Sequence, residues 1–80
     1  MESQFNQAFD VLKSLDVPVY VHADDNGNFS ISAPSEDVAD YWAAPSNWVF
    51  GVHPDIDEIL REHGLFAEWV NPERLAVYKI

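Results

Sequence analysis

The chain has 80 residues, of which 48% are hydrophobic and 14% aromatic, and its formal net charge is −10. This length predicts a single compact domain over residues 1–80, and the aromatic content argues against an acidic disordered segment, because such segments lack aromatic side chains. The charge repels nucleic acid and anionic lipid, so we expect a basic or neutral partner and binding to neither DNA nor a membrane.

Cysteine is absent, which excludes disulfides and zinc sites with thiolate ligands. The sequence shows no secretory signal and no apolar run of the roughly 18–20 residues that a membrane-spanning helix needs. These features predict a cytoplasmic protein, and we expect it to be a monomer.

The first part of the chain predicts a helix followed by a β-hairpin. Apolar residues at helical spacing indicate an amphipathic helix over residues 2–15. It should stop before Pro18, because the residue preceding a proline avoids the helical region. Residues 19–23 and 29–33 have the β-branched, aromatic or alternating character of strands. Residues 24–28 form the predicted turn, whose Asn-Gly pair favours positive φ.

The remaining predicted elements are a helix over residues 34–42, a strand over 48–52, a helix over 54–63, and strands over 65–70 and 75–80. Ser35 is the expected N-cap of the first of these helices. Pro54 suits the first position of the next helix, and Gly64 suits its end. The order αββαβαββ predicts an α+β fold, with a mostly antiparallel sheet of about five strands and about three helices packed mainly on one face.

No catalytic, cofactor or metal site is indicated, so we expect no enzymatic activity. Residues 24–28 look like a calcium loop, but aligning Gly27 with the invariant glycine puts His22 and Ala33 where Asp and Glu are required. The spacing of His53 and His63 matches no metal-ligand signature. No serine lies in a nucleophile elbow, and no glycine-rich loop is present to hold a phosphate.

The acidic residues are the strongest functional signal in the sequence. Nine of them fall in three groups, which we predict to form a partner-binding acidic face: Asp24 and Asp25; Glu36, Asp37 and Asp40; and Asp55, Asp57, Glu58 and Glu62. Glu36/Asp40 and Glu58/Glu62 are i,i+4 pairs on predicted helices, with Cβ atoms roughly 5–6 Å apart, and like charges at that spacing repel. Stability alone would therefore not select them.

A duplex carries one negative charge per about 1.7 Å of its axis. An acidic face of similar density could occupy the groove of a DNA-binding protein and so act as a DNA mimic. Trp42 and Trp48 are candidate aromatic anchors, since tryptophan is a common interface anchor. The alternative is a small acidic accessory or structural domain, whose charge serves solubility or a high-salt habitat without any mimicry of nucleic acid.

In size, acidity and lack of cysteine, the chain resembles the small phage-encoded inhibitors of bacterial defence, especially the type I anti-CRISPR proteins. The resemblance rests on Glu36-Asp37-Val38-Ala39-Asp40, Asp55-Ile56-Asp57-Glu58 and the ending Glu68-Trp69-Val70-Asn71-Pro72-Glu73-Arg74-Leu75. It is a likeness of general character and carries over no site residue. It implies a stoichiometric inhibitor in the host cytoplasm. Such an inhibitor would bind the Lys/Arg-rich, PAM-reading part of a CRISPR surveillance complex and exclude target DNA.

Overall fold

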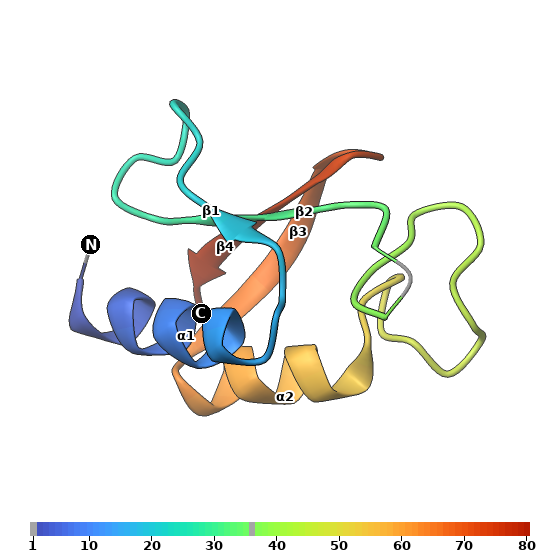
Figure 1. The fold of residues 1–80 in the computed structure, drawn as a ribbon, viewed down its shortest axis with the longest axis horizontal. Helices are drawn as coiled ribbons and strands as arrows, with labels where there is room; N and C mark the ends of the chain where they lie inside the picture. Colours follow the sequence, from blue (N-terminus) through green and yellow to red (C-terminus); the bar gives the residue numbers. More distant parts are fainter. Residues whose placement is uncertain (1, 36) are drawn as a thin grey trace.

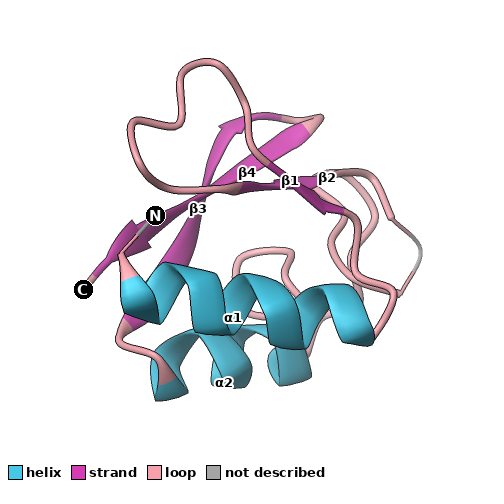
Figure 2. Ribbon diagram, turned by 60° about the vertical axis from the view of Figure 1, so that its left-hand side comes forward, coloured by secondary structure: helices cyan, strands magenta, loops and turns pink. Residues whose placement is uncertain are grey.

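The computed structural model describes residues 2–35 and 37–80, which form two helices and four strands. In chain order these are α1 (Ser3–Ser14), β1 (Val19–Tyr20), β2 (Ser30–Ser32), α2 (Pro54–Glu62), β3 (Leu65–Asn71) and β4 (Arg74–Lys79). The strands make one antiparallel sheet in the order β1-β2-β4-β3. Both helices lie on the same side of it (Figure 1 and Figure 2). The predicted α+β class is confirmed, with one strand and one helix fewer than expected in the described residues.

The two helices follow the sequence pattern closely. α1 buries Phe5 and Leu12 on the side predicted to face the core. α2 begins with Pro54, directly after His53, whose Nδ1 accepts a hydrogen bond from the Asp55 backbone N–H at 3.0 Å. This contact satisfies one of the N–H groups that a helix start leaves unpaired. No helix in the described ranges is long and apolar enough to cross a lipid bilayer.

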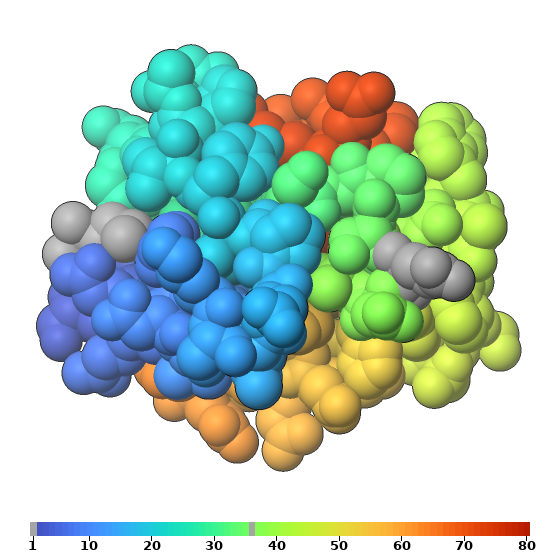
Figure 3. All heavy atoms as spheres, in the orientation of Figure 1, coloured from blue at the N-terminus to red at the C-terminus, as the bar shows by residue number. Residues whose placement is uncertain are grey.

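The core lies between the helices and the sheet. The side chains that are fully buried there include Leu12, Phe29, Ile31, Leu60, Leu65, Leu75 and Val77. Phe29 makes T-shaped contacts with two rings from α1, Phe5 at 6.4 Å and Phe9 at 5.4 Å between centroids. Seen from outside, residues 40–50 form one flank of the molecule, beside α2 and away from α1 (Figure 3).

The first hairpin is confirmed, but its strands are shorter than predicted. Only Val19↔Ile31 and Tyr20↔Ser30 pair between β1 and β2. Residues 21–29 make a wide loop on the side of the sheet opposite the helices (Figure 1 and Figure 2). The loop does not close as a two-residue turn because the Asp25 side chain points inward and bonds to the sheet.

The second predicted helix does not form in the described residues of its segment, and Ser35 caps no helix. Its backbone is bonded to a distant part of the chain instead. The Asp40 N–H donates to the Gly51 carbonyl at 2.9 Å, and the His53 N–H donates to the Val38 carbonyl at 2.8 Å. These long-range bonds replace the i→i−4 bonds that would continue a helix.

The strand predicted over residues 48–52 is also wrong. Val49 and Val52 exchange both of their backbone hydrogen bonds, at 3.0 and 2.9 Å. Between them, Phe50 and Gly51 have φ of +49° and +81°, so the chain reverses in a two-residue turn. The apolar run therefore makes a tight hairpin rather than one straight strand.

Candidate protein-interaction surfaces

A row of carboxylates runs along the exposed side of α2. Asp55, Glu58 and Glu62 follow one another at spacings of i+3 and i+4, which places them on one side of the helix, and all three are exposed. We call these three residues the acidic row. Within the described parts of the chain, no lysine or arginine forms an ion pair with any of them. The only basic side chain that the described residues place against the acidic row is His53, whose Nδ1 lies 3.9 Å from Oδ2 of Asp55.

Two further carboxylates lie beside the start of α2. Asp16, Asp37 and Asp55 line the same hollow, whose volume is about 450 Å³ and whose apolar lining includes Val17 and Ile56. The structure thus joins one member of the second predicted group to the third group. Asp16 was not predicted as a site residue. It stands alone in the sequence, and only the fold brings the end of α1 to α2.

The first predicted group lies elsewhere. Asp24 and Asp25 belong to the loop on the side of the sheet opposite the helices (Figure 2). Asp24 is exposed and lies 3.9 Å from Nη1 of Arg74, whereas the Asp25 side chain is only 2% exposed. The three predicted groups do not form one continuous face, and Asp25 is not a surface residue.

Asp25 is held in a network of hydrogen bonds. Its carboxylate accepts from the His22 backbone N–H at 2.7 Å, from the Ser30 hydroxyl at 2.7 and 2.9 Å, and from Nη2 of Arg74 at 3.1 Å. Burial by itself would raise the pKa of Asp25. The hydrogen bonds from His22, Ser30 and Arg74, together with the positive charge of Arg74, outweigh that effect and lower the pKa below its ordinary value.

The other predicted acids make local contacts or lie outside the described residues. Asp40 accepts from the backbone N–H groups of Trp42 and Ala43 at 2.9 and 3.1 Å, which fixes a turn. Asp57 is bonded to Nε of Arg61 at 3.0 Å on a different side of α2 from the acidic row. Glu36 lies outside the described residues. Neither Asp40 nor Asp57 presents an unpartnered charge to a binding partner.

The two predicted aromatic anchors differ in exposure, and a third aromatic residue is more exposed than both. Trp42 is 76% exposed, as expected of an interface anchor. Trp48 is half-buried, and its ring centroid lies 5.3 Å from that of His53. Phe50 is more exposed than either, at 87%. No pattern in the sequence reveals this, because Phe50 sits in an apolar run that is typical of a buried strand.

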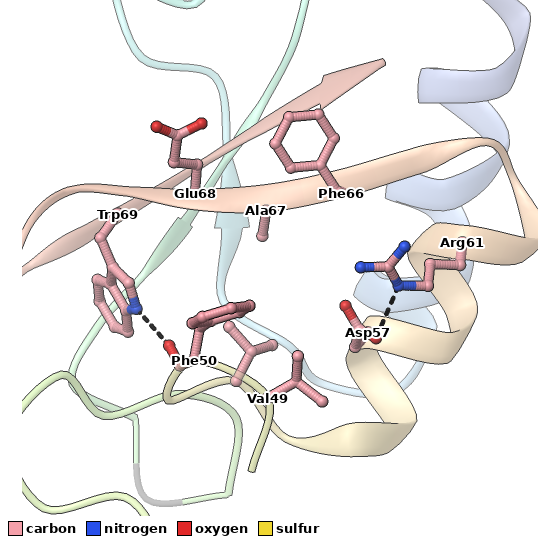
Figure 4. Close-up of a pocket in the computed structure, with 9 residues that line it drawn as sticks. Val49, Phe50, Asp57, Arg61, Phe66, Ala67, Glu68 and Trp69 are labelled. Atoms are coloured by element: carbon pink, nitrogen blue, oxygen red, sulfur yellow. Dashed lines mark hydrogen bonds and ion pairs between the residues drawn. The ribbon is translucent and has the colours of Figure 1, made fainter. Parts of the chain in front are cut away.

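An apolar cleft of about 360 Å³ opens beside β3. Its lining comes from β3, from α2 and from the turn before α2: Val49, Phe50, Val52, Asp57, Arg61, Phe66, Ala67, Glu68 and Trp69. The indole Nε1 of Trp69 donates to the Phe50 carbonyl at 2.6 Å and ties the turn to the strand (Figure 4). At the opposite end of the cleft, the Asp57–Arg61 pair closes it with two charges that neutralise each other (Figure 4).

The three histidines act within their own segments. His22 Nδ1 accepts from the Asp24 N–H at 3.0 Å, His53 Nδ1 accepts from the Asp55 N–H at the start of α2, and His63 Nδ1 lies 2.8 Å from the Ile59 carbonyl oxygen. In the described ranges, no group of three His, Cys, Asp or Glu side chains is placed to hold a metal ion. Comparisons of the chain with models of known protein families, with curated proteins and with solved structures find no match.

Proposed function

We propose that this chain is a non-catalytic inhibitor that binds the basic, DNA-binding surface of another protein and keeps nucleic acid out of it. The observation that carries the proposal is the acidic row, together with Asp16 and Asp37 at its N-terminal end. These carboxylates belong to α2, to the turn after α1 and to the segment between β2 and α2, and no lysine or arginine pairs with them in the described residues. A groove lined with Lys and Arg would supply the missing counter-charges.

The spacing within the acidic row supports a binding role over a structural one. Glu58 and Glu62 are like charges at i,i+4, which destabilises a helix by a few tenths of a kcal/mol. Glu62 also lies in the last turn, where the helix dipole disfavours negative charge. Asp55 lies in the first turn, where the dipole favours it, but the Glu58/Glu62 pair costs stability in the free protein, and a basic partner would recover that cost on binding.

The narrower form of this proposal names the partner. The resemblance to type I anti-CRISPR proteins points to the PAM-reading part of a type I CRISPR surveillance complex. The second candidate function is an acidic accessory or structural domain with no such target. One observation favours it: acidic residues outside the predicted groups, including Asp10 and Glu73, are exposed as well.

The two functions are separated by a capture experiment with matched variants. The wild-type chain, Glu58→Gln/Glu62→Gln and Asp10→Asn/Glu73→Gln are each immobilised and exposed to a host lysate, and bound proteins are eluted with a salt gradient. Each double variant loses two exposed charges. The inhibitor function predicts that a DNA-binding protein is retained by the wild type and by Asp10→Asn/Glu73→Gln, and is lost from Glu58→Gln/Glu62→Gln. Equal retention by both variants would contradict it.

Binding to the captured protein should also compete with DNA. We expect a duplex added in excess to displace the wild-type chain, because both would occupy the same cationic groove. The same assay with a purified type I surveillance complex tests the narrower proposal. A captured protein that binds the chain and its DNA simultaneously would exclude mimicry of nucleic acid.

A further inference from the structure

The outer edge of β3 has backbone groups that point away from the sheet. Val77 of β4 pairs in register with Ala67 of β3. Its N–H donates to the Phe29 carbonyl at 3.0 Å, and its carbonyl accepts from Asn28 Nδ2 at 2.8 Å, so both groups face away from β3. Ala67 is therefore in a non-hydrogen-bonded pair, and its own N–H and C=O point to the free edge. No strand of the described residues pairs with that edge.

The apolar cleft follows this edge. Successive side chains of a strand point to opposite faces, yet all four residues from Phe66 to Trp69 line the cleft. The cleft must therefore run along the edge rather than lie on one face. Figure 4 shows Ala67 and Trp69 on the same side of β3 as Phe50, and Phe66 and Glu68 on the other side.

Phe50 is held in an unusual position at the cleft. Its φ of +49° lies in the left-handed region, which a bulky residue adopts only at an energetic cost. Its carbonyl is fixed by the Trp69 indole, while the residue as a whole is 87% exposed. Such a ring contributes little to the core, but its apolar surface would be removed from water when a partner covers it. Strained backbone of this kind is typical of binding sites.

Charge decides what can occupy the cleft. Glu68 is exposed at its rim, and no lysine or arginine of the described residues pairs with it. A second copy of this chain would bring another acidic edge and a further charge of −10, which disfavours a β3–β3 dimer. A segment with basic residues would instead compensate Glu68.

We propose that β3 accepts an extended segment of a partner protein as an added strand, and that this segment alternates apolar and basic residues. The backbone of Ala67 would supply hydrogen bonds to it, as in other cases of strand addition. Its apolar side chains would enter the cleft against Phe50 and Trp69, and its basic side chains would lie beside Glu68. This docking surface is separate from the acidic row.

The test uses defined peptides. The probe is acetyl-Lys-Val-Lys-Val-Lys-Val-Lys-amide, and its control has the same composition in blocks, acetyl-Lys-Lys-Val-Val-Val-Lys-Lys-amide. Titrations followed by amide chemical shifts should show tighter binding of the alternating peptide, with the largest changes along β3 and at Phe50. Phe50→Ala should weaken it about tenfold, the loss expected of an aromatic anchor. Val21→Ala, which shortens an exposed side chain elsewhere, should leave it unchanged.

A charge swap tests the role of Glu68. Glu68→Lys should lose affinity for the lysine peptide and gain affinity for acetyl-Glu-Val-Glu-Val-Glu-Val-Glu-amide. The variant Glu58→Gln/Glu62→Gln should bind the lysine peptide as the wild type does. A failure of this proposal can therefore be distinguished from a failure of the proposed function, which rests on the acidic row.

Three results would overturn the proposal: equal binding of the block peptide, shift changes that map to the acidic row rather than to β3 and Phe50, or no effect of Phe50→Ala. Sedimentation provides a further check. A dimer of the wild type that Phe50→Ala dissociates would make a second copy the occupant, and the proposal would be wrong.

Discussion

Nη2 of Arg74 lies 3.1 Å from Oδ1 of Asp25, although 49 positions separate the two residues in the sequence. The contact joins the loop before β2 to the first residue of β4 and is almost completely buried. Nε of Arg74 also donates to the Ser30 hydroxyl at 3.1 Å. One of the chain's four basic residues is thus used to hold the fold together, and one of its fourteen acidic residues is lost from the surface.

Arg74→Met should destabilise the protein strongly. It would leave the Asp25 carboxylate buried without its charged partner, and breaking a buried pair in this way costs about 3–5 kcal/mol. Urea denaturation followed by tryptophan fluorescence measures the free energy of unfolding. Arg61→Met is the matched control, because Arg61 is exposed and its pair with Asp57 should contribute only about 0.3–0.5 kcal/mol. Equal losses in the two variants would show that the buried network is not important for stability.

The stability of the wild type relative to Asp25→Asn should depend on pH. The folded-state pKa of Asp25 is lowered below its ordinary value of 3.8, so the ionised carboxylate stabilises the fold above that pH. This contribution is lost as the pH falls below 3.8 and through the folded-state pKa. The difference in unfolding free energy between wild type and Asp25→Asn should therefore be constant near neutral pH and shrink in acid. A difference that grows as the pH falls would mean that the pKa is raised instead.

Gly51→Ala should destabilise the protein much more than Gly27→Ala. Both glycines have positive φ, +81° and +90°, so both substitutions strain the backbone. A Cβ at Gly51 would also lie 2.7 Å from the Asp40 carbonyl oxygen, whereas nothing lies within 4 Å of one at Gly27. We expect Gly27→Ala to lower the free energy of unfolding by about 1 kcal/mol, which is within the range for a non-glycine residue in the left-handed region. The loss for Gly51→Ala should be clearly larger. Thermal unfolding of the two variants compares them, and similar melting temperatures would contradict the close approach of these segments.

Trp69→Phe should loosen the turn that carries Phe50. The substitution removes the indole N–H that donates to the Phe50 carbonyl, and a hydrogen bond of this kind contributes about 1 kcal/mol. Faster amide exchange is expected at Val49 and Val52, whose mutual hydrogen bonds define the turn. Trp42→Phe is the control, since Trp42 is 76% exposed. If both variants leave exchange unchanged, the indole does not hold the turn.

The elements that the sequence predicted well are those fixed by local pattern. Apolar residues at helical spacing located α1, and the proline and acidic residues at its start located α2. The two long strands were found by their β-branched and aromatic residues, and in the structure they form the best-paired hairpin. In each case, neighbours in the sequence were enough to define the structure.

The errors occur where distant segments pair. Residues 38–40 have a helical pattern, but their backbone bonds to residues 51–53, and no local signal reveals a partner a dozen positions away. The prediction of Asp25 as a surface residue fails for the same reason. Asp25 is buried against Arg74, which only the sheet brings close to it. The acidic row was predictable from helical spacing alone. The neighbourhood of Asp16, Asp37 and Asp55 was not, because it requires the packing of α1 against α2.

The acidic row is tested most directly by the salt dependence of binding to the captured DNA-binding protein. The affinity of the captured protein for the wild type, for Glu58→Gln/Glu62→Gln and for Asp10→Asn/Glu73→Gln would be measured at several salt concentrations. We predict a steep loss of wild-type affinity with salt, a lower affinity and a shallower slope for Glu58→Gln/Glu62→Gln, and wild-type behaviour for the control. If the two double variants show the same affinity and the same slope, the carboxylates of α2 do not form the binding surface.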